Sequence, residues 1–545
     1  MMNGEIQDNP MPGRVPEKEL THGASYYDTE TGKPMYSMTK KDTLFCVLAV
    51  VLSFIGLTLT LWGGFHVGFT VSYVLLFALM TAHLKSRENK PTVFAIVCGV
   101  LSLALSGVFA LINDFSIRFF SFACVYVLGA EWFASLAGAN DPRTQGGLFV
   151  HILKQTFGAA FGSFNRMWNT IFSEKNQKMK GVGKGLLALI CSIPVIAVLI
   201  LLLQEADMAF EGLLNRIGEE LGTWIGRLIL TVLAAPLLIS YGLALKKRAH
   251  FTVTKERKGM DNVYLITFLG VISAIYVLYL FSQLAYFTDA FSGLLPDGFL
   301  PAEYARRGFF ELCWIAAINL AVQFTAMAIA KKNDGKRSPA VTGECLFISA
   351  FTLFLISTAI AKMVLYVERF GMTGARVTAS AFMIFLAVVF LSMIVHCFRE
   401  TPVLRVALVA AACVLLVLGY GNMNKRIAQY NIRAYEQGSL KTLDVYAIYD
   451  LGDDAVEELY GITQNEKMAD YHDNAWKCLC YLIRDEYQID WDNNEILPEN
   501  FDDNVPNEKH QWGEWSLTES KKEAVLRESY ETLRVKEWKE RWRNK

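Results

Sequence analysis

The stretch Thr43–Leu61, TLFCVLAVVLSFIGLTLTL, contains no charged residue, and a second such stretch, Phe65–Leu84 (FHVGFTVSYVLLFALMTAHL), follows the short turn Trp62–Gly64. A helix needs roughly 20 mostly apolar residues to cross the hydrocarbon core of a bilayer. The two stretches therefore predict a helical hairpin in a membrane, because lipid offers no hydrogen-bond partner to an open strand. The first stretch does not resemble a secretory signal peptide, since it lacks a small-residue cleavage site and another span follows it almost at once.

The composition of the whole chain agrees with this interpretation. Of 545 residues, 53% are hydrophobic and 19% are charged, and the mean hydropathy is +0.28. A soluble protein usually has about a quarter of its residues charged. Glycine, proline and the ten cysteines occur at ordinary frequencies, which excludes collagen-like, disordered and disulfide-scaffold proteins. The sequence therefore predicts an all-α, polytopic membrane bundle.

Eleven stretches are long and apolar enough to span the bilayer. They are Thr43–Leu61, Phe65–Leu84, Val93–Ile112, Ile117–Ala137, Lys184–Leu203, Ile225–Leu245, Val263–Ala285, Gly308–Ala330, Glu344–Val367, Arg376–Cys397 and Val403–Tyr420. Pro194 and Pro236 are expected to kink or curve the fifth and sixth spans.

The orientation of the spans follows from Lys and Arg in the short loops, because cytoplasmic loops carry an excess of these residues. Basic residues gather before the first span and in every second loop after it: 85–92, 138–183, 246–262 and 331–342. The other loops hold few or none: 113–116, 204–224 and 286–307. We therefore predict a cytoplasmic N-terminus and an extracytoplasmic C-terminus.

These boundaries divide the chain into five parts. Residues 1–42 are predicted to be a disordered cytoplasmic tail, 43–137 the first four spans, 138–183 a cytoplasmic loop, 184–420 seven further spans, and 421–545 an extracytoplasmic domain. In the cytoplasmic loop, Leu148–Phe172 resembles an interfacial amphipathic helix. A short helix packed on the bundle is an equally good interpretation of that segment.

Residues 421–545 are acidic, with 17 Lys and Arg against 26 Asp and Glu. The pattern predicts helices over Met423–Tyr435, Leu443–Leu451, Asp453–Gly461, Glu466–Tyr487 and Ser516–Trp542. The last helix begins with the capping-box spacing of Ser516 and Glu519. Six tryptophans supply apolar mass, so we expect a compact helical domain.

No catalytic or metal site is predicted. His472, Cys478 and Cys480 would point to different faces of one helix, and a disulfide between cysteines two residues apart would be strained. The two cysteines are therefore interpreted as packed or independently paired thiols. Gly181–Gly185 lacks the spacing of a phosphate-binding loop, and HExxH, GxSxG, paired CxxC and dinucleotide-binding motifs do not occur. We expect no cofactor.

Polar residues at membrane depth are better candidates, because each is costly there unless it has a partner. Five form a candidate intramembrane site: Glu131, Asn319, Gln323, Glu311 and Lys362. Asn319 and Gln323 lie one turn apart on one helix face, and Glu311 and Lys362 are expected to form an ion pair. The structural alternative, that these residues only tie helices together, is favoured over a substrate or proton path.

Several segments resemble a bacterial, mostly Gram-positive family of polytopic membrane proteins, domain of unknown function 4173, and its relative 4153. The segments are Glu205–Phe210, Ala305–Leu312, Gly371–Arg376, Ile427–Asn431, Leu443–Tyr446 and Asp453–Val456. The family has no established activity, so the resemblance implies no catalytic residue. In the predicted topology all these segments lie on the extracytoplasmic side. They supply a candidate outer-face motif of Asp207, Arg306, Arg307, Arg376 and Asp444. We expect the C-terminal domain to dock on the outer loops, with basic residues of the loops meeting Asp444, Asp450, Asp453 or Asp454.

Three functions remain open. The sequence favours a non-enzymatic sensor, scaffold or envelope-associated protein that presents an outer helical domain. The alternative is a transporter of a small solute or ion through the intramembrane polar groups, although no internal repeat is evident. A membrane glycosyltransferase is less favoured, because the first outer loop contains no carboxylate. The expected partners are the lipid bilayer of a bacterial plasma membrane and a second membrane or envelope protein, and no nucleic acid.

Overall fold

The computed structural model of the chain describes residues 39–85, 90–138, 156–162, 208–246, 260–291, 309–331, 338–399, 401–487 and 516–534, with a few isolated positions. Among these residues 88% are helical and none belongs to a strand. Ten of the described helices are long and apolar enough to cross a membrane. The chain is therefore an all-helical, multi-pass membrane protein, as the sequence predicts.

The ten helices coincide with ten of the eleven predicted spans. They are α1 (Lys40–Leu57) continued by η1 (Thr58–Trp62), α2 (Val67–Leu84), α3 (Val93–Leu111), α4 (Phe115–Leu136), α8 (Met208–Lys246), α9 (Asn262–Phe291), α11 (Phe309–Ile329), α12 (Pro339–Phe370), α13 (Gly374–Phe398) and α14 (Val403–Tyr420). The predicted fifth span, Lys184–Leu203, lies outside the described residues apart from two single positions.

The first helix begins earlier than predicted, at Lys40, so the last residues assigned to the N-terminal tail belong to α1. Thr39 and Asp42 form a capping box: the Thr39 hydroxyl accepts a hydrogen bond from the Asp42 amide, and the Asp42 carboxylate accepts one from the Thr39 amide at 3.0 Å. Such reciprocal bonds satisfy free N–H groups at a helix start. The rest of the tail, residues 1–38, lies outside the described part of the chain.

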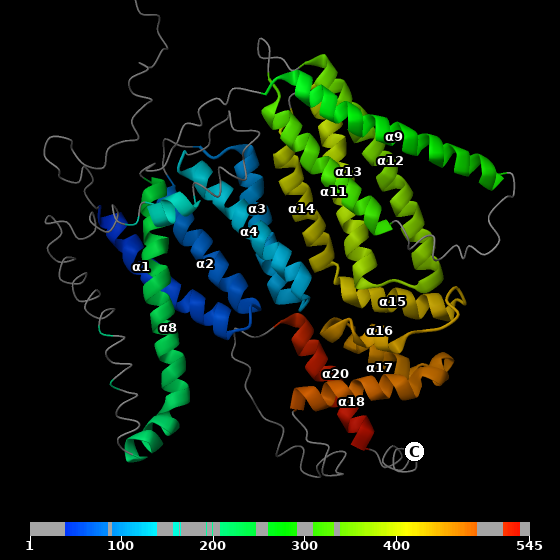
Figure 1. Cartoon of the computed structure of the whole chain (residues 1–545). Helices are drawn as coiled ribbons and strands as arrows, with labels where there is room; N and C mark the ends of the chain where they lie inside the picture. The colour runs from blue at the N-terminus through cyan, green and yellow to red at the C-terminus, as the bar shows by residue number, and fades with distance from the viewer. Residues whose placement is uncertain are drawn as a thin grey trace, which may run out of the picture.

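The membrane helices form two groups that α14 joins (Figure 1). The first group contains α1 to α4 and α8, and the second contains α9, α11, α12 and α13. Helix α14 packs on α13 and also on α3 and α4. Its last residue, Tyr420, donates a hydrogen bond to the Ala104 carbonyl of α3 at 2.9 Å. The helices that meet are thus not always neighbours in the sequence.

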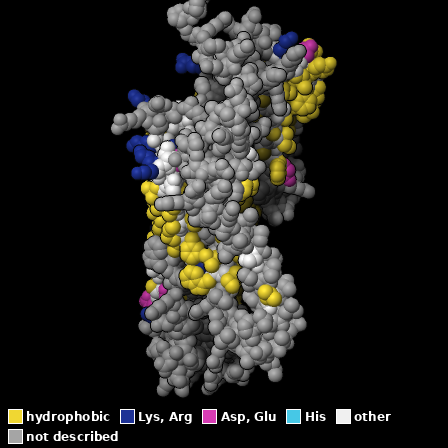
Figure 2. Space-filling view, turned by 90° about the vertical axis from the view of Figure 1, so that its left-hand side faces the viewer, with side chains coloured by type: hydrophobic (Ala, Val, Ile, Leu, Met, Phe, Trp, Pro, Cys, Tyr) yellow, Lys and Arg dark blue, Asp and Glu magenta, His cyan; other side chains and the backbone are white. Residues whose placement is uncertain are grey.

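The outer faces of the bundle are apolar. Leu44, Phe119 and Leu278 expose 59%, 59% and 69% of their surface, and many other large hydrophobic residues of the spans are similarly exposed. Figure 2 shows such side chains crowded on one face of the molecule. Exposed apolar surface of this extent is suited to contact with lipid tails rather than with water.

Only a short part of loop 138–183, which the sequence predicts to be cytoplasmic, is described. Helix η2 (Gly158–Gly162) packs against α8, and the Ser240 hydroxyl donates to the Ala159 carbonyl at 3.0 Å. Phe157 and Phe161 on the same segment remain exposed. This contact agrees with a helix packed on the bundle, and the remainder of Leu148–Phe172 lies outside the described residues.

The C-terminal unit, residues 423–487 and 517–534, is a small helical body at one end of the bundle (Figure 1). Its elements are α15 (Met423–Glu436), α16 (Val445–Tyr449), η4 (Gly452–Ala455), α17 (Val456–Gln464), η5 (Glu466–Tyr471), α18 (His472–Tyr487) and α20 (Leu517–Arg534). One apolar core joins them, and Cys478 and Cys480 are buried free thiols within it. Burial raises the pKa of Cys478 to about 11 and that of Cys480 to about 12.

Candidate functional site

The C-terminal unit contacts the membrane bundle at two corners. The first is the α3–α4 corner, residues 111–114, where α3 ends and α4 begins. Three hydrogen bonds hold this contact. The Asn113 amide donates to Asp453 of η4 at 2.9 Å. Asn424 of α15 donates to Asp114 at 3.4 Å, and Thr518 of α20 donates to the Leu111 carbonyl at 2.6 Å. The corner therefore joins segments that are separated by more than 300 residues.

A buried carboxylate, Asp454, supports the first corner. One oxygen of Asp454 accepts hydrogen bonds from the Thr518 hydroxyl at 2.7 Å and from the Asn422 amide at 3.2 Å. Burial raises the pKa of Asp454 above its ordinary value, and the charges of Asp453 and Asp114 act in the same direction, while the two hydrogen bonds lower it. Ionisation of the Asp454 carboxyl group therefore costs free energy in the folded protein.

We expect the Asp454→Asn variant to change how the stability of the C-terminal unit depends on pH. A carboxyl group whose folded pKa is raised binds more protons in the folded state, so its contribution to stability falls as the pH rises from about 4 through the folded pKa. Asparagine keeps the accepting oxygen but cannot ionise. The difference in melting temperature, variant minus wild type, should therefore grow between pH 4 and pH 7. The exposed Asp450→Asn variant is the control, and a difference independent of pH would contradict the prediction.

The second contact is the α12–α13 corner, residues 371–373. The Asn431 side chain accepts a hydrogen bond from the Met372 amide at 2.6 Å and donates one to the Met372 carbonyl at 2.8 Å. Gly371 has a φ of +79°, and a Cβ atom there would lie 2.7 Å from the side-chain oxygen Oδ1 of Asn431. Only glycine combines this left-handed backbone with so close an approach. Residue 371 therefore lets α15 dock against the corner.

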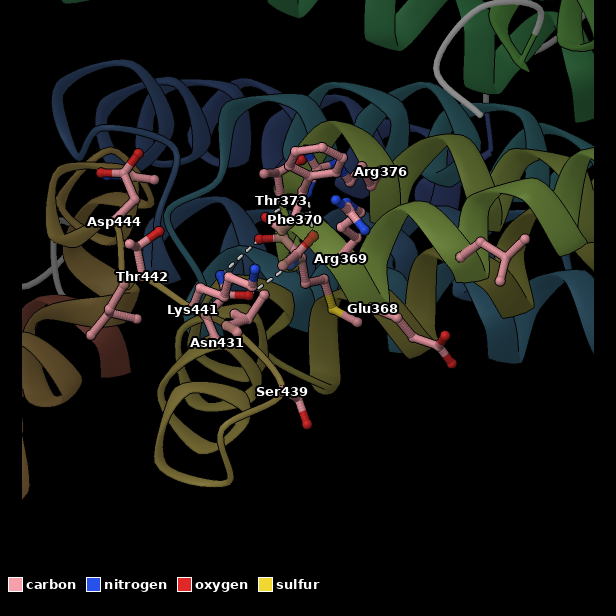
Figure 3. Close-up of a pocket in the computed structure, with 16 residues that line it drawn as sticks. Glu368, Arg369, Phe370, Thr373, Arg376, Asn431, Ser439, Lys441, Thr442 and Asp444 are labelled. Carbon is pink, nitrogen blue, oxygen red and sulfur yellow. Dashed lines mark hydrogen bonds between the residues drawn. The ribbon is translucent and has the colours of Figure 1, made fainter. Parts of the chain in front are cut away.

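A basic groove opens beside the second corner. It consists of two adjoining hollows of about 840 and 670 Å³, which share Glu368 and Ser439. Five cationic side chains line them: Arg369 and Arg376 from the bundle, and Arg426, Arg433 and Lys441 from the C-terminal unit. Glu368 and Asp444 are the acidic residues of the lining. Figure 3 shows the larger hollow, with side chains from both parts of the chain around it.

Two of the five predicted outer-face residues line this basic groove. The Arg376 guanidinium donates to the backbone carbonyls of Phe370 (3.2 Å) and Gly371, and it lies over the Tyr366 ring at 4.2 Å. The Asp444 carboxylate caps α16 by accepting from the Ala447 amide at 3.0 Å. The other three predicted residues, Asp207, Arg306 and Arg307, lie outside the described part of the chain.

The expected docking occurs at Gly371–Arg376, but its chemistry differs from the prediction. Basic residues of the outer loops were expected to pair with Asp444, Asp450, Asp453 or Asp454. Asp453 instead contacts Asn113 and Lys522, the latter within the C-terminal unit at 3.2 Å. The α3–α4 corner that Asp453 contacts carries asparagine and aspartate rather than Lys or Arg.

The two intramembrane amides form ties between helices. Asn319 of α11 accepts from the Tyr276 hydroxyl of α9 and donates to Thr352 of α12 at 2.8 Å. Gln323 accepts from the Ser349 hydroxyl at 2.8 Å, and its buried amide nitrogen has no partner among the described atoms. These contacts join three helices by hydrogen bonds in the membrane interior.

The hydrogen bonds of these two amides do not involve the charged intramembrane candidates. Glu131 is 4% exposed, and its electrostatic neighbour is Arg405 of α14. Glu311 lies in the first turn of α11 and is exposed, and its ion pair with Lys362 of α12 stays a prediction. Whether two side chains on neighbouring helices meet depends on the rotation of each helix about its axis, and sequence spacing does not reveal that rotation.

Four neutral residues that hold the corners are not predicted from the sequence: Asn113, Asn424, Asn431 and Thr518. Uncharged side chains at a helix end give no charge pattern from which to predict a contact. A signal did exist, because Gly371–Arg376 and Ile427–Asn431 were both among the segments of the resemblance. The hydrogen bonds of Asn431 with Met372 join these two segments directly, and Leu443 and Asp444 of a third line the groove beside them.

Among the described residues, no three His, Cys, Asp or Glu side chains are arranged to hold a metal ion. No curated protein and no solved structure matches the chain. The model of one protein family matches residues 95–462, from α3 to α17, a range that includes both corners and every residue of the groove lining. The chain therefore belongs to the family described as "Domain of unknown function (DUF4153)".

Proposed function

We propose that the protein is a non-enzymatic, multi-pass protein of a bacterial plasma membrane that presents the C-terminal unit, docked on the bundle, at the extracytoplasmic surface. In this role it acts as a sensor, scaffold or envelope-associated protein. The observation that carries the proposal is the double docking of the unit, at the α3–α4 corner and at the α12–α13 corner. A unit held at two separated places can report on, or impose, the relative position of the two helix groups.

The described helices support the predicted topology. Phe45 of α1, Leu136 of α4 and Leu245 of α8 share one apolar cluster, so α4 and α8 both end where α1 begins. Helix α8 therefore begins at the opposite end of the bundle, and the chain must pass from one end to the other between α4 and α8. The predicted fifth span, Lys184–Leu203, would make that passage. An eleven-span chain with a cytoplasmic N-terminus then has its C-terminal unit outside.

We expect reporters fused to the chain to distinguish the two sides of the membrane. A reporter placed after Lys545 should behave as extracytoplasmic, and one placed in loop 246–262 should behave as cytoplasmic. A fusion in loop 332–337 is the matched control and should agree with the latter. Alkaline phosphatase and green fluorescent protein fusions measure the two states. If the fusions after Lys545 and in loop 246–262 report the same side, the topology is wrong.

Transport remains the second candidate function. The observation that favours it is the buried, unpartnered amide nitrogen of Gln323, since a polar group of this kind in lipid is costly. If the wild type carries a small solute or ion into proteoliposomes, and the Gln323→Met variant folds but loses this flux, transport is favoured over a purely structural role. The further relation to domain of unknown function 4173, and the bacterial origin, rest on the sequence resemblance and are part of the proposal.

A further inference from the structure

The C-terminal unit is acidic overall, yet the surface that it turns toward the second corner is basic. Arg426, Arg433 and Lys441 from this unit meet Arg369 and Arg376 of the bundle around the groove. The lining contains five cations and only two acids, whereas residues 421–545 as a whole contain more acids than bases. Like charges repel, so gathering cations at one place is unfavourable unless an anion joins them.

Among the described residues, the cations of the groove lack the carboxylate partners that other basic residues of the unit have. Lys425 pairs with Glu457, and Lys521 and Lys522 lie 3.8 and 3.2 Å from carboxylates. In contrast, the exposed Arg369, Arg433 and Lys441 form no ion pair with any described acidic residue. Their donors are therefore available to a ligand, and the Thr373, Ser439 and Thr442 side chains of the lining add hydroxyl groups.

The groove lies at the edge of the apolar belt. Helix α12 contains 32 residues, more than the roughly 20 that cross the hydrocarbon core, so its end near Arg369 extends to the headgroup level. Leu365 and Phe370 line the larger hollow with 63% and 50% of their surface exposed. Tyr366 beside them lies under Arg376. Aromatic residues of this kind are enriched where a membrane protein crosses the lipid headgroups.

We propose that this basic groove binds the phosphate of an anionic phospholipid headgroup. Arginine and lysine side chains bind phosphate oxygens by charge-assisted hydrogen bonds. The volume of the larger hollow, about 840 Å³, suits a small ligand. Free phosphate would present the same oxyanion, but the exposed Leu365 and Phe370 favour a ligand that also carries acyl chains. The proposal rests on the docked arrangement of the proposed function, and it does not depend on which side of the membrane the groove faces.

The test compares two double variants of the full-length protein in a neutral detergent. Arg433→Gln with Lys441→Gln removes two cations from the groove. Lys467→Gln with Arg527→Gln removes one lysine and one arginine from exposed positions of the same unit outside the groove. Short-chain phosphatidylglycerol, phosphatidylcholine and inorganic phosphate are the probes, and binding is measured by titration at low and high salt. Thermal unfolding and protease protection of residues 421–445 show separately whether the unit is folded and docked.

We expect phosphatidylglycerol to bind the wild type more tightly than phosphatidylcholine and to weaken with salt. Each basic residue near a membrane contributes about a fivefold change in affinity for an anionic lipid, so the groove variant should bind about 25-fold more weakly. The control variant should bind like the wild type. Equal binding of the two lipids, or an unchanged affinity of the docked groove variant, would overturn the proposal while leaving the proposed function intact. Inorganic phosphate that competes as well as phosphatidylglycerol would overturn the lipid as the source of the phosphate.

Discussion

Replacement of Asn431 by leucine should lower the free energy of unfolding by about 2–4 kcal/mol, because two hydrogen bonds are lost and their backbone partners remain at a partly buried place. The Asn431 amide bonds both the N–H and the C=O of Met372. Leucine fills a similar volume and can bond neither group. The loss should appear as a lower melting temperature in detergent and as faster proteolysis between α14 and α16, because the C-terminal unit is released from the α12–α13 corner.

Two further variants separate this interpretation from a general effect on α15. Asn431→Asp keeps the acceptor for the Met372 amide but places a second oxygen against the Met372 carbonyl, so it should be as damaging as leucine or more so. Gln437→Ala, at an exposed position just after α15, is the control and should change little. Equal melting temperatures for Asn431→Leu and Gln437→Ala would show that the corner contributes nothing to docking.

The sequence predicted the membrane helices well because the bilayer imposes their length and composition. A run of about 20 apolar residues has few alternatives in lipid. The errors lie at helix ends, where short polar contacts decide the boundary. Helix α12 begins at Pro339 rather than near Glu344, since the Glu344 carboxylate accepts a hydrogen bond from Ser273 at 2.6 Å and is accommodated within the helix.

The candidate site could be predicted only in part. Arg376 and Asp444 line the groove, and the predicted topology placed their segments on the same side of the membrane. The neutral residues of the corners could not be predicted, because their contacts depend on how distant helices are placed. Asn113 and Asp453 meet across 340 residues, and no periodicity in the sequence relates them. The ion pair of Asp42 with Lys246 could not be predicted for the same reason, since the two residues lie 204 positions apart in the chain.

The pair of Asp42 and Lys246 should have the largest single effect on stability. The Asp42 side chain is fully buried at the start of α1, and the Lys246 ammonium at the end of α8 lies 2.5 Å from its carboxylate. Removal of one partner from a buried ion pair is strongly destabilising and costs about 3–5 kcal/mol. We therefore expect Lys246→Met to lower the free energy of unfolding by about that amount and to loosen α8 from α1.

A double variant tests whether the cost arises from the charge left behind. In Asp42→Asn with Lys246→Met no charge remains, and asparagine can still accept the capping hydrogen bond from the Thr39 amide. Most of the lost stability should then return, since replacing both partners of a buried pair is often close to neutral. Lys331→Met, at an exposed lysine just after α11, controls for the loss of a basic residue near the end of a membrane helix. Thermal unfolding of the four proteins in detergent gives the comparison. If the double variant is no more stable than Lys246→Met, the lysine acts through packing of its chain along α1 rather than by neutralising Asp42.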